Sequence, residues 1–442
     1  MLPQISQRFS RDMTGLKNLF ALSERKDAIS FAGGYPAKEL FPKAALDQAF
    51  KARTSQSLAD FYQYSSALGY LPLRQKLAQR AKKAGINCQA DNIMLTQGAQ
   101  QAISLLADLY LDEGDCMAVE APTYIGALEA FQSRKPHFFE VEMQADGLDL
   151  DQLEAICQSY PLKLVYTIPD FQNPTGICMS LRKRQRLAQM AAEYGFLVIE
   201  DDPYRDLRYQ GESLPSIKSF DQKGNVVFLG SFSKILAPAL RTGWMIADPQ
   251  IIGLARDLRL AYDCNPSNII GQAIDEYLTH NDLEAHIAKI NHFYQQRLQL
   301  MLTCLKQEFP AECHFTKPKG GFFIWVTLPK EYRAQDLLTS GSEVTFVEGS
   351  ELFVVSHQAN GFRLNFTGVN EAQIKKGCRL LGQALKKCCA SRLLTFNFFE
   401  IAILRFFDYN YFVDEMDKIE EPIKKCKKMQ ELSCFHSTPT RN

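Results

Sequence analysis

Three short apolar runs, each followed at once by polar residues, constrain the fold of this chain most strongly. They lie at residues 164–168, 196–199 and 226–229. Short, continuously apolar runs are typical of parallel strands that are buried on both faces. Between the first two runs, apolar residues recur at helical spacing over 181–194, and Gly195 is a helix stop signal. A strand, a helix and a strand in this order form a βαβ unit, which predicts a parallel sheet with helices on both faces.

The polar residues that follow the three runs predict a ligand site. The first run leads to Asn173, the second to Asp201 and Tyr204, and the third to Ser231 and Lys234. In open α/β sheets, ligands bind beyond the carboxyl ends of the strands, so these side chains are expected to converge in one crevice. An amine that forms a Schiff base, a carboxylate beside a ring nitrogen, and donors for a phenolate and a phosphate are together what pyridoxal phosphate requires.

The length of the chain favours more than one domain. With 442 residues it is too long for one compact core. A strand and helix are expected over 93–110, and a long helix from about 282 to 309 is where we place the boundary between two domains. The last segment, from about 388 to 442, is rich first in Phe and then in Lys, and no chemistry can be assigned to it.

Composition argues against several classes of protein. The 50 basic and 50 acidic residues balance, which gives no indication of nucleic-acid binding. The nearest candidate for a membrane span, 393–407, is interrupted by polar residues, and the N-terminus lacks a secretory pattern. The 12 cysteines are scattered without a CxxC motif, and the 7 histidines show no ligand spacing. We therefore expect a cytoplasmic protein with reduced thiols, no metal and no membrane or nucleic-acid partner.

Four motifs together resemble those of a known family. They are Asn173–Gly176, Glu200–Tyr204, Ser231–Lys234 and Gly361–Leu364. In this order, over roughly residues 5 to 387, the chain resembles a class I/II aminotransferase of pyridoxal-phosphate fold type I. Within that class it is most similar to the 2-aminoadipate, kynurenine and multi-substrate group.

The resemblance implies an α/β fold in two parts. The larger is a domain with a mostly parallel seven-stranded sheet flanked by helices, and the smaller is an α+β domain from the C-terminal part and the N-terminal segment. The expected division is an N-terminal arm and small-domain segment at 1–44, a large cofactor-binding domain at 45–285, a small domain at 286–387 and an extension at 388–442. The resemblance also implies a homodimer.

The resemblance further implies a role for each motif residue. Lys234 would carry pyridoxal phosphate as a Schiff base, Asp201 would pair with the pyridinium nitrogen, and Asn173 and Tyr204 would hold the phenolate oxygen. Tyr124 would stack on the ring. The phosphate would be bound by Ser231, Ser233, Arg241 and the backbone of Ala99 and Gln100, and it would be reached by Tyr64 of the partner subunit.

Substrate recognition would centre on Arg363, which would clamp the α-carboxylate with help from Asn173 and Gly34. Arg363 lies between the strand-like runs 352–355 and 364–366. Tyr35 would line the side-chain pocket. Once freed by the substrate amine, Lys234 would be the base that moves the Cα proton, and a second oxo acid such as 2-oxoglutarate would complete a ping-pong reaction.

Several alternatives remain open at the level of sequence. Asp202 competes with its neighbour Asp201 for the pyridinium role. Relatives often carry a hydroxyl residue where Ala99 stands, and Glu348–Gly349 replaces a common Pro-Gly. Another reaction on the same cofactor, by a C–S β-lyase, a decarboxylase or a cyclopropane-forming synthase, is the second functional hypothesis. A transcription regulator that borrowed the fold is the third, although only about thirty residues precede Gly34, too few for a helix-turn-helix module.

Overall fold

The computed structural model describes most of the chain, namely residues 3–6, 8, 15–25, 27–56, 59–338 and 343–388. Residues 1–383 form one compact unit and residues 384–442 another. The predicted extension lies outside the described residues from 389 onward, and so does the apolar stretch 393–407. Among the described residues, no helix is both long and apolar enough to cross a membrane.

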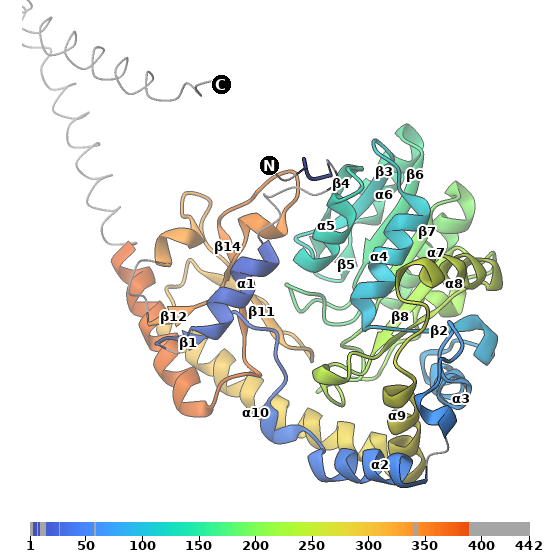
Figure 1. The fold of residues 1–442 in the computed structure, drawn as a ribbon. Helices are drawn as coiled ribbons and strands as arrows, with labels where there is room; N and C mark the ends of the chain where they lie inside the picture. The colour runs from blue at the N-terminus through green and yellow to red at the C-terminus, as the bar shows by residue number, and fades with distance from the viewer. Residues whose placement is uncertain are drawn as a thin grey trace, which may run out of the picture. The chain divides into compact units, whose positions relative to one another are not determined.

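The described residues of the first unit contain a large sheet of eight strands (Figure 1). From one edge to the other these are β2 (Ile93–Thr96), β9 (Gly243–Ile246), β8 (Val226–Ser231), β7 (Leu197–Asp201), β6 (Leu162–Thr167), β3 (Cys116–Ala121), β4 (His137–Gln144) and β5 (Gly147–Leu148). From β8 to β4 all neighbours are parallel, whereas β9 runs antiparallel to both of its neighbours. The predicted mostly parallel sheet with flanking helices is therefore confirmed.

The predicted count of seven strands was too low by one. After β4 the chain turns at Gly147, whose φ of 110° lies in the region that favours glycine, and β5 pairs antiparallel with the end of β4. A strand of two residues carries no hydrophobic pattern of its own, so the sequence did not reveal it.

Helices cover both faces of this sheet. On one face lie α6 (Leu150–Ser159) and α7 (Leu181–Tyr194), and on the other α4 (Ala99–Tyr110), α5 (Ile125–Gln132) and α8 (Pro249–Tyr262). The bounds of α7 are those of the predicted helix. It begins after Ser180, whose hydroxyl accepts from the Lys183 amide, and it ends at Gly195, which adopts the left-handed conformation.

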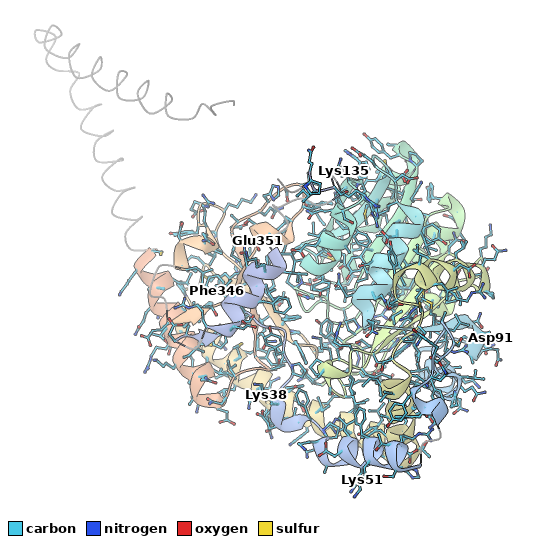
Figure 2. The ribbon with its side chains drawn as sticks, viewed as in Figure 1. Lys38, Lys51, Asp91, Lys135, Phe346 and Glu351 are labelled. Carbon is cyan, nitrogen blue, oxygen red and sulfur yellow. The ribbon has the colours of Figure 1, made fainter. Side chains whose placement is uncertain are left out.

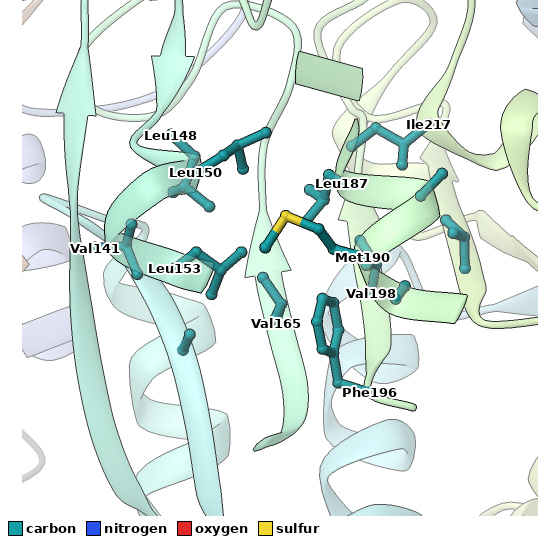
Figure 3. Close-up of a cluster of buried hydrophobic side chains, with 14 of the residues drawn as sticks. Val141, Leu148, Leu150, Leu153, Val165, Leu187, Met190, Phe196, Val198 and Ile217 are labelled. Carbon is teal, nitrogen blue, oxygen red and sulfur yellow. The ribbon is translucent and has the colours of Figure 1, made fainter. Parts of the chain in front are cut away.

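The hydrophobic cluster between the sheet and helices α6 and α7 fixes which way each strand residue points (Figure 3). Val165 on β6 and Val198 on β7 both face this cluster. Because successive side chains of a strand alternate between faces, their neighbours Tyr166 and Ile199 face the α5 side. The polar ends of the strands are thereby sorted onto two faces of the sheet.

Leu187 of α7 gives a test of this core. The side chain has no exposed surface, and the Leu187→Ala variant should lose about 2–5 kcal/mol of unfolding free energy because a buried cavity is created. Leu181 on the same helix is 39% exposed, so Leu181→Ala should change stability by less than about 1 kcal/mol. Urea denaturation followed by circular dichroism measures both, and equal losses would contradict this assignment of the core.

A smaller antiparallel sheet follows in the C-terminal part, with strands in the order β10 (His314–Phe315), β11 (Phe323–Thr327), β14 (Gly361–Asn365) and β13 (Val347–Glu348). The N-terminal segment joins this part, because β1 (Ile29–Ser30) pairs in parallel with β12 (Val344–Thr345). The long predicted helix is α10 (Leu283–Glu308), and a last helix begins at residue 371. The N-terminal segment and the described C-terminal part thus both contribute to the smaller part, as expected.

The remaining elements pack around these two sheets. Helices α2 (Lys43–Gln56) and α3 (Leu71–Ala81) both contact α9 (Asn268–His280). The short 3-10 helices are η1 (Lys38–Leu40), η2 (Ala59–Tyr62), η3 (Lys82–Ala84), η4 (Ala90–Asn92), η5 (Ile217–Phe220), η6 (Pro238–Leu240), η7 (Ala334–Leu337) and η8 (Ser350–Leu352).

Helix α1 (Gly15–Glu24) connects the two sheets. Three leucines of α1 pack on a cluster that contains Ile125 from α5 and Trp325 from β11. Polar contacts reach the same two parts, because the Leu16 amide donates to Glu129 of α5 at 2.8 Å and Asn18 donates to Glu351 of η8 at 3.0 Å. Figure 2 labels Glu351 beside α1. The N-terminal segment therefore contacts both the part built on the large sheet and the part built on the small sheet.

Candidate active site

The carboxyl ends of β6, β7 and β8 lie side by side at one edge of the large sheet, because the three strands are parallel neighbours. β7 ends at Asp201, and β8 ends at Ser231 just before Lys234. The loop that follows β6 carries Asn173, which is buried. The predicted convergence of an amide, a carboxylate and an amine is present in the structure.

The Lys234 amine is held by backbone. Its Nζ donates a hydrogen bond to the Gly34 carbonyl at 2.9 Å. Burial, together with the positive charges of Arg363 and Arg241, lowers the pKa of the Lys234 ammonium to about 8. At pH 7 about a tenth of this amine is therefore uncharged, far more than for an ordinary lysine, and the uncharged form is the one that attacks a carbonyl carbon.

Asp201 is buried with one oxygen unused. Its Oδ2 accepts a hydrogen bond from the Tyr166 hydroxyl at 2.7 Å, while Oδ1 has no hydrogen-bond partner among the described residues. Burial raises the pKa of the Asp201 carboxyl to about 6, although the Tyr166 hydrogen bond and the Lys234 charge both oppose the shift. The carboxylate is thus ionised at neutral pH and can accept a further donor.

The acidic neighbours of Asp201 bind elsewhere. Glu200 accepts from the Ser216 hydroxyl at 2.7 Å and from the Ile217 amide at 2.8 Å, on the side of the α7 core. Asp202 forms an ion pair with Arg205 at 3.1 Å. The alternation of side chains along β7 accounts for this division. Of the two competing aspartates, Asp201 is the one whose pKa responds to Lys234.

Arg363 of β14 is buried against the large sheet. Its guanidinium donates to Asn173 Oδ1 at 2.8 Å and to the Ala32 carbonyl at 2.5 Å, and it lies 4.2 Å from the centre of the Phe323 ring. Its Nε has no hydrogen-bond partner in the described part of the chain. Burial lowers the pKa of Arg363 to about 10, which leaves it charged at neutral pH. The guanidinium therefore keeps a donor for a further acceptor.

Two tyrosines lie close to Asp201 and Arg363, whose charges act on both phenols. Tyr204 is buried, with the rings of Phe322 and Phe323 each 5.7 Å from its own. The Tyr124 hydroxyl donates to the side-chain oxygen of Gln100 at 3.3 Å. Burial raises the pKa of the Tyr124 phenol to about 12, so it remains protonated at neutral pH.

The start of α4 forms a cradle with Arg241. Gly98 has a φ of 73°, and a Cβ at this position would stand 2.8 Å from Arg241 Nη2, so no larger residue fits there without a shift. Arg241 donates to the Gln97 carbonyl at 3.1 Å. The first amides of α4, those of Ala99 and Gln100, have no partner within the helix, and such amides bind anions.

The two serines after β8 also lie in this region of the chain. Both Ser231 and Ser233 are buried, and the Ser233 amide donates to the Ser231 hydroxyl at 3.1 Å. Because a hydroxyl can both accept and donate, Ser231 keeps a donor for a further ligand.

Two of the predicted residues are exposed; one of them, Tyr64, is expected to act on the partner subunit, which a single chain does not test. Tyr64 is 83% exposed, and its backbone amide donates to the side chain of the neighbouring Gln63. Tyr35 is 42% exposed, and burial of the remainder raises the pKa of its phenol. Gly34, the residue before Tyr35, does reach the cleft, because its carbonyl accepts from Lys234.

The sequence reading missed Tyr166 and Glu120. Tyr166 was read as part of an apolar run, although a buried tyrosine usually finds a partner for its hydroxyl, and that expectation was the available signal. Glu120 at the end of β3 accepts from Thr167 and from Gln172, and burial raises the pKa of its carboxyl to about 7. It holds the loop that presents Asn173.

The unused groups of the cleft fit a ring that bears a phosphate. Asp201 Oδ1 is a buried acceptor for a protonated ring nitrogen. Lys234 offers an amine of lowered pKa, and the α4 start with Arg241 offers an anion site in which a Cβ at Gly98 would crowd the Arg241 guanidinium. Each requirement of pyridoxal phosphate is met by a residue present here.

Comparison with known proteins points the same way. A family model described as "Aminotransferase class I and II" matches residues 30–381. The chain is 37% identical over 393 residues to aromatic-amino-acid aminotransferase 1 of Thermococcus litoralis, a match that covers 86% of this chain and 94% of the relative.

Two solved structures are similar along nearly their whole length. One is the kynurenine aminotransferase of Pyrococcus horikoshii in complex with PMP, KYN and KYA, with 37% identity, a TM-score of 0.80, and coverage of 86% of this chain and 97% of that one. The other is the α-aminoadipate aminotransferase of Thermus thermophilus complexed with N-(5'-phosphopyridoxyl)-L-leucine, with 34% identity, a TM-score of 0.78, and coverage of 84% and 97%.

Proposed function

The chain belongs to the class I and II aminotransferase family, and from this premise we propose that it transfers the α-amino group of an amino acid (2-aminoadipate, an aromatic amino acid or a broad range) to a 2-oxo acid such as 2-oxoglutarate. The enzyme is a pyridoxal-phosphate-dependent transaminase. Its two half-reactions would share one site in ping-pong order.

The single observation that carries this proposal is that Lys234, Asp201 and Arg363 lie close enough together for the charges of Asp201 and Arg363 to shift the pKa of Lys234. An amine of lowered pKa, a buried carboxylate with a free oxygen and a buried guanidinium with a free donor thus lie together. When bound, pyridoxal phosphate withdraws the electrons left at the substrate Cα and accepts the amino group.

Lys234 is the proposed proton carrier. It would hold the cofactor through Nζ, and once released by the substrate amine it would take the proton from the substrate Cα. Because the pKa of this amine is about 8, both its protonated and its unprotonated forms are populated near neutral pH, as a general base requires.

The ring would be held by four side chains. Asp201 Oδ1 would accept from the ring nitrogen and keep that nitrogen protonated. Asn173 and Tyr204 would hold the phenolate oxygen, and Tyr124 would pack on the ring. Burial raises the pKa of the Tyr204 phenol, so this phenol stays protonated at neutral pH, which supports its assignment as a donor.

The phosphate would lie at the start of α4. The proposed donors are the side chains of Ser231, Ser233 and Arg241 and the backbone amides of Ala99 and Gln100. Gly98, whose φ is positive, lies next to the Arg241 guanidinium at the start of α4. Ala99 has no hydroxyl, so the backbone amide supplies the whole contribution of that position.

Arg363 is the proposed clamp for the substrate α-carboxylate, with Asn173 and the Gly34 segment beside it and Tyr35 at the side-chain pocket. Asn173 already accepts one hydrogen bond from the guanidinium, which fixes the orientation of the planar group. A planar fork matches a carboxylate in two parallel bonds.

The active enzyme is proposed to be a cytoplasmic homodimer in which Tyr64 of one subunit reaches the phosphate of the other. The high exposure of Tyr64 supports this, since a tyrosine at 83% exposure is available to a second subunit. The large domain is proposed to span 45–285 and the small domain 286–387 together with the 1–44 segment, a division supported by the pairing of β1 with β12.

A panel of single amino acids tests the reaction type. Mixed with the holoenzyme and no oxo acid, kynurenine, phenylalanine or 2-aminoadipate should each yield at most one equivalent of 2-oxo acid per active site, because the amino group stays on the enzyme. Adding 2-oxoglutarate should restart turnover. A lyase or a decarboxylase would instead continue without an oxo acid and release ammonia or carbon dioxide. Rates across the panel rank the donors, and absence of any 2-oxo acid would refute the proposal.

A further inference from the structure

Tyr166 reaches Asp201 across the sheet from the neighbouring strand. In the parallel pairing of β6 and β7, Tyr166 lies opposite Ile199. Since Ile199 and Asp201 are two residues apart, they share a face with Tyr166. The phenol extends along that face toward the carboxyl end of the strands, where its hydroxyl donates to Asp201 Oδ2 at 2.7 Å.

The Tyr166 ring is fixed by packing as well as by this hydrogen bond. The side chain has no exposed surface, and the ring meets Phe131 of α5 edge to face, with centres 5.6 Å apart and planes at 67°. The ring would therefore keep its place without the hydroxyl, and a change that removes the hydroxyl alone isolates the hydrogen bond.

The direction of the hydrogen bond is also fixed. Burial, followed by the negative charge of Asp201, raises the pKa of the Tyr166 phenol well above its usual value, so the phenol always donates. A donor to a carboxylate stabilises the ionised form, which opposes the effect of burial on Asp201. The other titratable groups whose charges couple to Asp201 are Lys234, Glu120, Tyr124 and Tyr204.

We propose that Tyr166 is the positioning residue of Asp201: it occupies Oδ2, keeps the carboxylate ionised, and leaves Oδ1 as the acceptor for the protonated ring nitrogen of the cofactor. The proposal rests on the proposed role of Asp201. It adds a residue that touches neither substrate nor cofactor and acts through the carboxylate alone.

Cofactor affinity as a function of pH tests this role. In Tyr166→Phe, the apoprotein should bind pyridoxal phosphate about tenfold more weakly near neutral pH, the size expected when a hydrogen bond to a charged group is lost. Without the donor, the pKa of Asp201 rises above its value of about 6, so the fall in affinity on acidification should begin at a higher pH than in the native protein. Fluorescence titration from about pH 5 to pH 9 measures both.

Tyr262→Phe is the matched control. The Tyr262 hydroxyl also donates to an aspartate, Asp108, but outside the cleft. This variant should leave both the affinity and its pH dependence unchanged. Because this experiment measures cofactor binding and the amino-acid panel measures turnover, a negative result in one can be told apart from a negative result in the other.

A double-mutant cycle separates positioning from packing. Once Asp201→Asn has removed the carboxylate, adding Tyr166→Phe should change the affinity by less than about twofold, since the two residues act as one unit. The proposal is overturned if Tyr166→Phe weakens binding equally at every pH, or if its effect is the same in the Asp201→Asn background. Should Tyr166→Phe not fold, fluorotyrosine at position 166 keeps the ring and makes the hydroxyl a stronger donor. The fall in cofactor affinity on acidification must then move to lower pH.

Discussion

Replacing Lys234 with alanine is expected to reduce kcat at least about 10⁴-fold, because one change removes both the covalent anchor of the cofactor and the base that takes the Cα proton. The contacts of Arg363 with Asn173 and Ala32 do not involve Lys234, so the variant should still bind amino acids. Lys223 lies in the turn before β8, at the opposite end of that strand, and Lys223→Ala should leave kcat unchanged.

The anchor itself can be located directly. Borohydride treatment of the holoenzyme, followed by peptide mass spectrometry, should place the cofactor on the peptide that contains Lys234 and on no other. The rate at which apoprotein takes up the cofactor should rise with pH through about 8, where the Lys234 amine loses its proton, and not through the ordinary lysine range. Cofactor fixed to another lysine would refute the assignment.

Arg363→Lys should lower kcat/KM for amino acids by about 10²–10³-fold, the size expected when a buried charge loses its paired geometry. Lysine keeps the charge and has three donors, but they sit on one rotating nitrogen and not on a planar fork. The two parallel bonds to the substrate carboxylate and the bond to Asn173 therefore cannot all be kept. The loss should appear mainly in KM if the clamp binds substrate and transition state alike.

Two controls isolate the carboxylate. A primary amine without an α-carboxylate should react equally slowly with the native enzyme and with Arg363→Lys, because the amine lacks the group that the clamp holds. Arg379 is exposed on the last helix, and Arg379→Lys should have no effect. If Arg363→Lys slowed the amine and the amino acid by the same factor, the arginine would support the fold of the site and not the substrate.

Much of the large domain could be predicted because its signals are local. The helix α7 was predicted with its observed bounds, since its periodic apolar face, its Ser180 cap and Gly195 all lie within the segment. The buried strands β6, β7 and β8 were located by apolar runs, although β7 and β8 extend further into the polar residues than the runs did. The convergence of Asn173, Asp201 and Lys234 then followed from the parallel pairing.

Features that depend on tertiary partners were not predictable. The apolar run 352–355 resembled a strand, yet it begins in the 3-10 helix η8, and Leu352 and Phe353 are buried beneath α1. A short apolar run indicates burial but not conformation, so its structure depends on the segments that pack against it. Tyr166 was missed for the same reason, because its role depends on which residue faces it on the neighbouring strand.

The alternation along β7 also makes the chemistry sensitive to length. Glu200, Asp201 and Asp202 form a run of three acids, and their faces differ only by position along the strand. Substituting Val198 would cost stability, but inserting or deleting one residue would turn a neighbouring acid into the cleft and Asp201 into the core. The strand therefore tolerates single substitutions far better than an insertion or a deletion. Natural variants of this segment should keep its length even where their apolar residues differ.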